Sequence, residues 1–205
     1  GNVEMWLNEL QRIMRWTMKK IVTDAIADYV VTARTTWVTN WPGQVVLGVG
    51  QCYWTKGVTD ALNNNGLDGI KEYLKVLSND LGGIVKLVRG KLKKMEKKTL
   101  GALCVVDVHS RDVVQDMVNA GCTRSDDFEW MAQQRYYWEN HPDTYNRYGD
   151  DPQNMVVRII QAEIMYGYEY IGNSGRLVIT PLTDRCFRTL AGAVSLMYGG
   201  APAGP

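Results

Sequence analysis

The sequence predicts a mainly α-helical protein in which long helices are followed by a β-hairpin and a final helix. Apolar residues recur at three- and four-residue spacing along residues 3–29 and 67–95, as expected for helices that each bury one face. Residues 166–180 instead place β-prone segments on either side of a turn with two glycines and an asparagine. The helical part of the chain is therefore expected to precede a small β structure.

The N-terminal helix is expected over residues 3–29, with Asn2 as a candidate N-cap residue. Residues 32–40 are rich in β-branched side chains and are predicted to form a connector. A break follows at Trp41-Pro42-Gly43, because proline disfavours helical backbone at the residue before it and glycine bends freely.

Two helices are predicted after this break. The first covers residues 44–62 and stops before Gly66, which can take the left-handed conformation that often ends a helix. The second covers residues 67–95, and its apolar stripe has nearly the period of coiled-coil packing. Gly82 and Gly83 interrupt the stripe, which predicts a bend or a close helix crossing at this point.

The next stretch predicts two more helices. Residues 100–108 are apolar and fit either a buried helix or a strand, and the acids beyond them favour one helix up to residue 120. Gly121 would end this helix. The run Ser125-Asp126-Asp127 then predicts a helix N-terminus, and that helix is expected to continue through residue 138.

The character of the chain changes near residue 154. Residues 141–154 are polar and are predicted to form an exposed loop, whereas the stretch that follows is apolar and β-rich. The hairpin is expected to pair residues 166–171 with residues 176–180, and a last helix is expected over residues 184–197. We therefore predict a module boundary near Asn154.

A basic cluster lies at the end of the long stripe and contains Lys91, Lys93, Lys94, Lys97 and Lys98. It could contact an acidic partner surface. A solvated helix face is the more common role of such a run, and we prefer that interpretation.

The composition argues against several classes of function. The 205 residues carry a formal net charge of +1, so no overall field directs the chain to nucleic acid or to an anionic membrane. The four cysteines form no C-x-x-C pair and the two histidines are not spaced as metal partners. This favours reduced thiols in an intracellular protein over a zinc site. No secretory leader is recognisable, and no apolar run reaches the roughly 18–20 residues needed to span a bilayer.

Both ends of the chain are expected to lie within a longer polypeptide. Residue 1 is a glycine followed at once by a helical pattern, and residues 199–205 form a Gly- and Pro-rich tail with no closing element. Phosphate-binding loops have the form G-x-x-x-x-G-K-[ST], whose backbone N–H groups close around the phosphates. Gly204 could be the first glycine of such a loop, although the tail alone is weak evidence.

Catalytic patterns are scarce in the sequence. No nucleophile and base stand at a recognisable spacing, and there is no paired-carboxylate motif. Asp107 and His109 lie two residues apart, a pattern that is more often structural than catalytic. The residue types alone therefore identify no reaction.

A longer stretch carries a family resemblance. Residues 166–186, Tyr-Gly-Tyr-Glu-Tyr-Ile-Gly-Asn-Ser-Gly-Arg-Leu-Val-Ile-Thr-Pro-Leu-Thr-Asp-Arg-Cys, resemble a signature that precedes the phosphate loop of the first AAA+ module in dynein heavy chains. Residues 199–205 are similar to the run-in to that loop. Motifs similar to those of the family's C-terminal linker occur upstream in the family's order: Trp41-Pro-Gly-Gln-Val-Val46, Tyr53-Trp-Thr-Lys56, Leu87-Val-Arg-Gly-Lys-Leu92, Lys97-Lys-Thr-Leu-Gly-Ala102, Asp107-Val-His109 and Phe128-Glu-Trp130.

The turn at residues 172–175 and the Trp-Pro-Gly-Gln stretch are similar to axonemal rather than cytoplasmic members. The sequence departs from the family pattern at Gly57, at Gly82-Gly83 and in the length of the loop at residues 141–154. These departures bear on local contacts and on the subtype.

The resemblance implies a two-part organisation. Residues 1–154 would be the C-terminal part of a dynein linker, and residues 155–205 would begin the first α/β AAA+ module, truncated at the Walker A loop. In the family, ATP binding and hydrolysis in that module bend and straighten the linker, and this drives movement along microtubules in cilia and flagella. The implied partners are the rest of the AAA+ ring, microtubules through the parent's stalk, and intermediate chains, light chains and other axonemal proteins, with neither nucleic acid nor membrane.

The resemblance also implies a nucleotide site for ATP or ADP with Mg²⁺. Apolar side chains would sandwich the adenine while backbone groups read its edge. The residues expected beside the adenine are Val178, Ile179, Pro181 and Leu182, for which plain core packing is the alternative. Gly204 and Pro205 would open the Walker A loop, and most of the other nucleotide contacts would lie beyond Pro205. No catalytic residue and no metal ligand are expected within the chain, so the chain alone should not hydrolyse ATP.

Two other interpretations remain open from the sequence. The chain could be the helical prefix of a different AAA+ remodelling ATPase, whose activity would not depend on microtubules. It could also be a non-enzymatic helical scaffold, which would be supported if no Gly-Lys-Thr followed Pro205. A direct reading of the residues beyond that proline would separate these possibilities.

Overall fold

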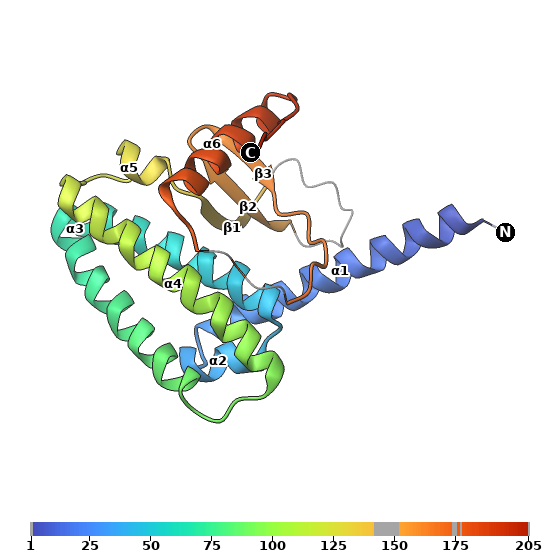
Figure 1. Cartoon of the computed structure of the whole chain (residues 1–205), viewed down its shortest axis with the longest axis horizontal. Coiled ribbons are helices and arrows are strands. Elements are labelled where there is room, and N and C mark those ends of the chain that lie inside the picture. Colours follow the sequence, from blue (N-terminus) through green and yellow to red (C-terminus); the bar gives the residue numbers. More distant parts are fainter. Residues whose placement is uncertain (1, 142–151, 174–175, 177, 205) are drawn as a thin grey trace.

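The computed structural model describes residues 2–141, 152–173, 176 and 178–204. Long helices form most of it, and a three-stranded antiparallel sheet and a final helix follow them (Figure 1). This confirms the predicted fold class. None of the described helices is long and apolar enough to cross a membrane.

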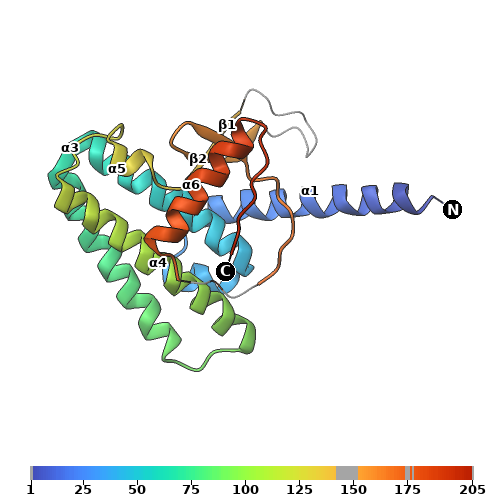
Figure 2. The ribbon, with the colours of Figure 1, turned by 45° about the horizontal axis from the view of Figure 1, so that its top comes forward.

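The N-terminal helix α1 covers Val3–Tyr29, the bounds that its periodicity predicts. Asn2 occupies the predicted N-cap position, but its side chain makes no capping hydrogen bond. The C-terminal half of α1 packs against the other helices, while its N-terminal half projects away from them (Figures 1 and 2). The expected connector contains a short helix, α2 (Arg34–Asn40), because Trp37 is buried and its Nε1 donates to the carbonyl oxygen of Ala25 at 3.0 Å.

Helix α3 (Gly43–Val88) consists of two arms that meet at Gly66, whose φ of 53° and ψ of −130° are not helical. The predicted stop at Gly66 is therefore confirmed, although the chain resumes as helix at once. The backbone stays helical at Gly82-Gly83, so the first predicted alternative, a bend, is absent there. The second alternative, a close helix crossing, is confirmed, because the second arm passes close to α2 and a Cβ atom on Gly83 would lie 3.4 Å from the Thr35 side chain. The second arm also ends seven residues before the predicted bound, at Val88 instead of residue 95.

Helix α4 (Lys94–Ala120) settles the choice between helix and strand for the apolar stretch at residues 100–108. It ends at Gly121, which has the expected left-handed backbone (φ 75°). Helices α3 and α4 pack along their lengths and share two hydrophobic clusters. One cluster also buries residues of α1, α2 and β2, and the other contains Trp54, Val58, Leu62, Ile70, Val114 and Trp130.

The helix expected to reach residue 138 is wrong beyond its first turn. Helix α5 covers only Phe128–Met131, and the chain then forms strand β1 (Arg135–Asn140). The Asp127 carboxylate accepts from the N–H groups of Thr123 and Arg124, so it stabilises the preceding turn instead of capping a long helix.

The sheet has the order β1-β2-β3, with β2 at Gln153–Ile159 and β3 at Ala162–Met165. The β2–β3 hairpin lies before the predicted one, so the expected strands at residues 166–171 and 176–180 are wrong: their described residues form no strand. Ser174, Gly175 and Leu177 lie outside the described residues. The physical reason is packing, because the buried Tyr168 hydroxyl accepts from the Met155 N–H at 2.8 Å instead of leaving the segment free to pair as a strand.

Helix α6 (Pro181–Ser195) confirms the last predicted helix and begins three residues earlier than expected. Most of the predicted loop at residues 141–154 lies outside the described residues. Asn154 lies within strand β2, where it pairs with Glu139 of β1. The module boundary near Asn154 remains a prediction about the parent protein.

Candidate functional site

The segment after β3 is held against the helices by hydrogen bonds from two amide side chains. Nε2 of the buried Gln44 donates to the carbonyl oxygen of Glu169 at 2.6 Å and to the Tyr166 hydroxyl at 3.3 Å, while its Oε1 accepts from the Ile171 N–H at 2.9 Å. Asn173 Nδ2 donates to Oγ1 of Thr99, on α4, at 2.8 Å. These bonds fix the path of the chain from the sheet to α6.

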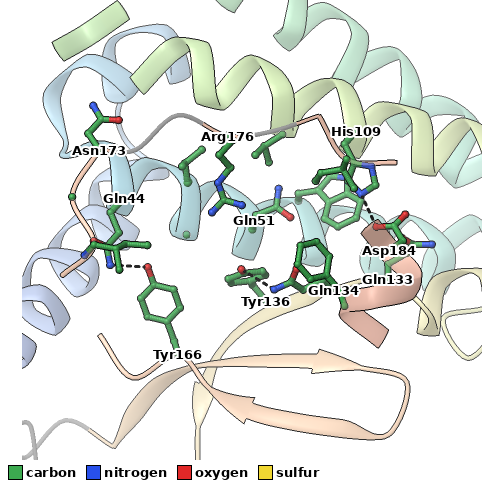
Figure 3. Close-up of a pocket in the computed structure, with 18 residues that line it drawn as sticks. Gln44, Gln51, His109, Gln133, Gln134, Tyr136, Tyr166, Asn173, Arg176 and Asp184 are labelled. Carbon is green, nitrogen blue, oxygen red and sulfur yellow. Dashed lines mark hydrogen bonds and ion pairs between the residues drawn. The ribbon is translucent and has the colours of Figure 1, made fainter. Parts of the chain in front are cut away.

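Two cavities lie along this path. The inner cavity, about 190 Å³, is enclosed by α3, α4, β1 and the segment at residues 166–187 (Figure 3), and its lining includes Gln44, Gln51, His109, Tyr136, Tyr166 and Arg176. The outer cavity, about 570 Å³, lies between α4, α5 and the start of α6, and its lining includes Val108, Asp112, Phe128, Val178, Ile179 and Pro181. Ile179 lines both cavities, so the segment before α6 separates them.

His109 and Asp184 also line both cavities. His109 Nε2 lies 4.0 Å from Asp184 Oδ1, which is ion-pair distance but too long for a hydrogen bond. Burial lowers the pKa of His109, and the nearby carboxylates of Asp184 and Asp112 oppose that shift. The contact between α4 and α6 is therefore weak when His109 is neutral and stronger when it is protonated.

The structure brings three of the four predicted adenine residues together at the outer cavity. Val178, Ile179 and Pro181 line it, whereas Leu182 is not among the lining residues and is 70% exposed. Their backbone is held by the Thr180 cap, in which Thr180 Oγ1 accepts from the Thr183 N–H at 3.3 Å. Gly204 is exposed in the C-terminal tail, and Pro205 lies outside the described residues. Their roles beside a nucleotide remain predictions.

The outer cavity has the volume of a small-molecule site, for which roughly 300–1,000 Å³ is typical. Apolar side chains form much of its wall, and the charged residues in its lining are four acids and one arginine: Asp112, Asp116, Glu129, Asp184 and Arg188. Within the described residues, no three His, Cys, Asp or Glu side chains are grouped so that they could hold a metal ion. This arrangement can bind and orient a flat apolar group, and it offers no evident nucleophile.

The sequence did not identify the residues that position this site. Gln44 contacts residues that lie more than 120 positions later in the chain, and nothing in its local pattern indicates that partner. The Trp-Pro-Gly-Gln stretch resembles a family motif, and this resemblance does not indicate the contact of Gln44. Tyr136 lies in strand β1, where the sequence predicts a helix.

Comparisons with known proteins identify the family. Residues 166–205 match the family described as the hydrolytic ATP binding site of the dynein motor region. Over all 205 residues, the chain is 49% identical to dynein axonemal heavy chain 12 of Homo sapiens and 46% identical to dynein axonemal heavy chain 1 of Homo sapiens. It is 45% identical, again over its whole length, to dynein axonemal heavy chain 3 of Mus musculus.

The chain belongs to the dynein heavy chain family. It spans only 6%, 4% and 5% of the length of these three relatives, respectively. The region that matches the dynein ATP-binding family begins at Tyr166, where the chain leaves the sheet and meets Gln44. That region therefore supplies one wall of both cavities. The facing wall of the inner cavity comes mainly from α3 and β1, and that of the outer cavity comes mainly from α4.

Proposed function

We propose that this chain is the C-terminal part of a dynein linker joined to the start of the first AAA+ module, within an ATP-driven microtubule motor of the axoneme. The observation that carries the proposal is the composition of the outer cavity. Its wall at residues 178–181 belongs to the stretch that matches the dynein ATP-binding family, and its opposite wall is the long helix α4. A ligand there would touch both proposed parts of the chain at once.

In this proposal the adenine of ATP or ADP binds in the outer cavity against Val178, Ile179 and Pro181. Leu182 does not line the cavity and is exposed, so in this proposal it would pack against parts of the first module outside this chain. Gly204 and Pro205 would open the Walker A loop, and the parent's residues beyond them would bind the phosphates and Mg²⁺. ATP hydrolysis then belongs to the parent, since this chain supplies no catalytic group in the proposal.

Helices α1, α3 and α4 would act as the lever. Helices α3, α4 and the second half of α1 pack against one another along buried stripes, and close-packed interfaces resist compression, so these helices can transmit displacement. The partners would be the rest of the AAA+ ring, microtubules through the parent's stalk, and intermediate chains, light chains and other proteins of the cilium or flagellum. Neither nucleic acid nor a membrane has a part in this function.

The adenine assignment can be tested in the parent heavy chain with Ile179→Asp. A carboxylate in this apolar wall would be desolvated beside the base, which should weaken ATP binding at the first module by about 2 kcal/mol, or roughly 30-fold. Ile160→Asp is the matched control, since Ile160 is an exposed turn residue between β2 and β3 with a φ of 53°. The measurement is the dissociation constant of a fluorescent ATP analogue. Equal affinities in the Ile179→Asp protein and the wild type would contradict the assignment.

A further inference from the structure

The inner cavity contains an arginine that has no charged partner among the described residues. Figure 3 shows the Arg176 side chain pointing into the cavity toward Gln51 and Tyr136. Asp184, the acid in the cavity lining, lies beside His109 at the opposite end from Tyr166. An arginine presents five N–H donors in a planar fork, and these favour an anion with two or more oxygens.

Two tyrosine hydroxyls reach the same cavity, and each already accepts one hydrogen bond. Gln134 Nε2 donates to the Tyr136 hydroxyl at 3.1 Å, and Gln44 Nε2 donates to the Tyr166 hydroxyl at 3.3 Å. The proton of each hydroxyl is therefore available for an acceptor in the cavity. The two rings lie 6.4 Å apart between centroids, which keeps the hydroxyls in one neighbourhood.

Both hydroxyls keep their protons at neutral pH. Burial raises the pKa of Tyr136 to about 12 and raises the pKa of Tyr166 as well. The positive charge of Arg176 acts to lower the pKa of both tyrosines, which opposes the effect of burial. This is expected if the guanidinium lies close to both hydroxyls.

We propose that the inner cavity is a binding site for a small oxyanion, either phosphate or carboxylate, held by Arg176, Tyr136 and Tyr166. The cavity volume of about 190 Å³ is several times the ~30 Å³ share of one water molecule, so a small ion fits with room for water. Charge-assisted hydrogen bonds from arginine to such an ion are about twice as strong as neutral ones. The ion is either free phosphate or an acidic side chain from another part of the parent protein.

This site is distinct from the proposed adenine pocket. Val178 and Pro181 line only the outer cavity, and Arg176 and both tyrosines line only the inner one. The two proposals are tested by different measurements: the adenine assignment by the ATP affinity of Ile179→Asp, and the oxyanion site by anion titration. If no oxyanion binds, the adenine assignment is therefore unaffected.

The test is isothermal titration of the 205-residue chain with sodium phosphate and, separately, with sodium acetate, at constant ionic strength held with chloride. We expect saturable binding of at least one anion with a dissociation constant in the millimolar range or tighter. Binding of phosphate alone assigns the site to free phosphate, and binding of acetate assigns it to a carboxylate.

Arg176→Gln should weaken this binding at least ten-fold, and Tyr136→Phe should weaken it several-fold. Arg176 is exposed, so its variant should keep the fold. The matched control is Arg89→Gln, at the exposed end of α3. The proposal is overturned if neither anion binds the wild-type chain, if Arg176→Gln retains full affinity, or if Arg89→Gln loses as much affinity as Arg176→Gln.

Discussion

Asp28 joins the end of α1 to the two segments that follow it. Its carboxylate accepts from Thr32 Oγ1 at 2.5 Å and from the Trp41 indole N–H at 2.7 Å. The hydrogen bond from Thr32, and then that from Trp41, lower the pKa of Asp28 below its ordinary value of 3.8. The ionised side chain thus helps to set the angle at which α2 and α3 leave α1.

The direction of this shift predicts how the contact responds to acid. Because the pKa is lower in the folded chain, the stabilisation from Asp28 is present above pH 3.8 and is lost as the pH falls through the lower folded value. The NMR resonance of the Trp41 indole N–H should therefore shift with a midpoint below 3.8. In Asp28→Asn that titration step should be absent. A midpoint at or above the ordinary value would show that these hydrogen bonds do not favour the carboxylate.

The candidate site was only partly predictable at this scale. The family resemblance predicts a shared site for Val178, Ile179 and Pro181. These residues are close together in the sequence, so they readily contribute to the same cavity wall. The facing wall comes from α4 and α5, and the positioning amide of Gln44 comes from α3. Contacts between residues this far apart in sequence depend on how the helices pack, which no local pattern specifies.

The angle in α3 depends on Gly66. Its φ of 53° with ψ of −130° is a backbone conformation that side chains with a Cβ rarely adopt, and a Cβ there would lie 3.2 Å from the carbonyl oxygen of Thr123. The two arms also approach closely, because a Cβ on Gly57 would lie 2.3 Å from the Tyr73 hydroxyl. The departure from the family pattern at Gly57 thus has a local reason in this chain.

Gly66→Ala is expected to destabilise the protein by about 1–3 kcal/mol, since alanine is strained in this conformation. Gly82→Ala is the control, because Gly82 has helical backbone and open space around its Cβ position. That change should stabilise the chain by up to about 1 kcal/mol. Free energies of unfolding from urea titration would measure both. If both substitutions changed the free energy of unfolding in the same direction, the backbone conformation at Gly66 would not be the reason that Gly66→Ala destabilises the protein.

Among the elements, length determined how well the sequence predicted them. Helices α1 and α4 have 27 residues each, and so many periodic positions leave little ambiguity about type. Helix α2 and the β2–β3 hairpin are short, and single tertiary contacts decide them: the Trp37 indole bond to Ala25 and the Tyr168 hydroxyl bond at Met155. Tertiary contacts of this kind override local propensity.

At the scale of the whole molecule, the two hydrophobic clusters lie along α3 and α4, and the first half of α1 belongs to neither. Its apolar side chains are exposed instead: Val3, Met5, Trp6, Leu7, Leu10, Ile13 and Met14. The second half of α1 is anchored by buried Met18, Val22 and Ala25. One continuous helix therefore has two very different environments.

Amide hydrogen exchange should divide α1 accordingly. In the isolated chain, residues 3–14 should exchange at least about ten-fold faster than residues 18–29, because opening the first half exposes no buried cluster. Mass spectrometry of peptic peptides would measure the difference, with α4 as the internal reference for a packed helix of equal length. Uniform protection along α1 would contradict the division.

The ladder between β1 and β2 has a mechanical consequence. Asn154 pairs with Glu139 within this ladder, so the chain cannot rotate at residue 154 unless hydrogen bonds between the strands break. At Gly66, by contrast, the helical backbone is interrupted, and the two arms of α3 are held together by side-chain packing. Under tension the sheet would resist extension, and bending of this part of the chain would occur at Gly66.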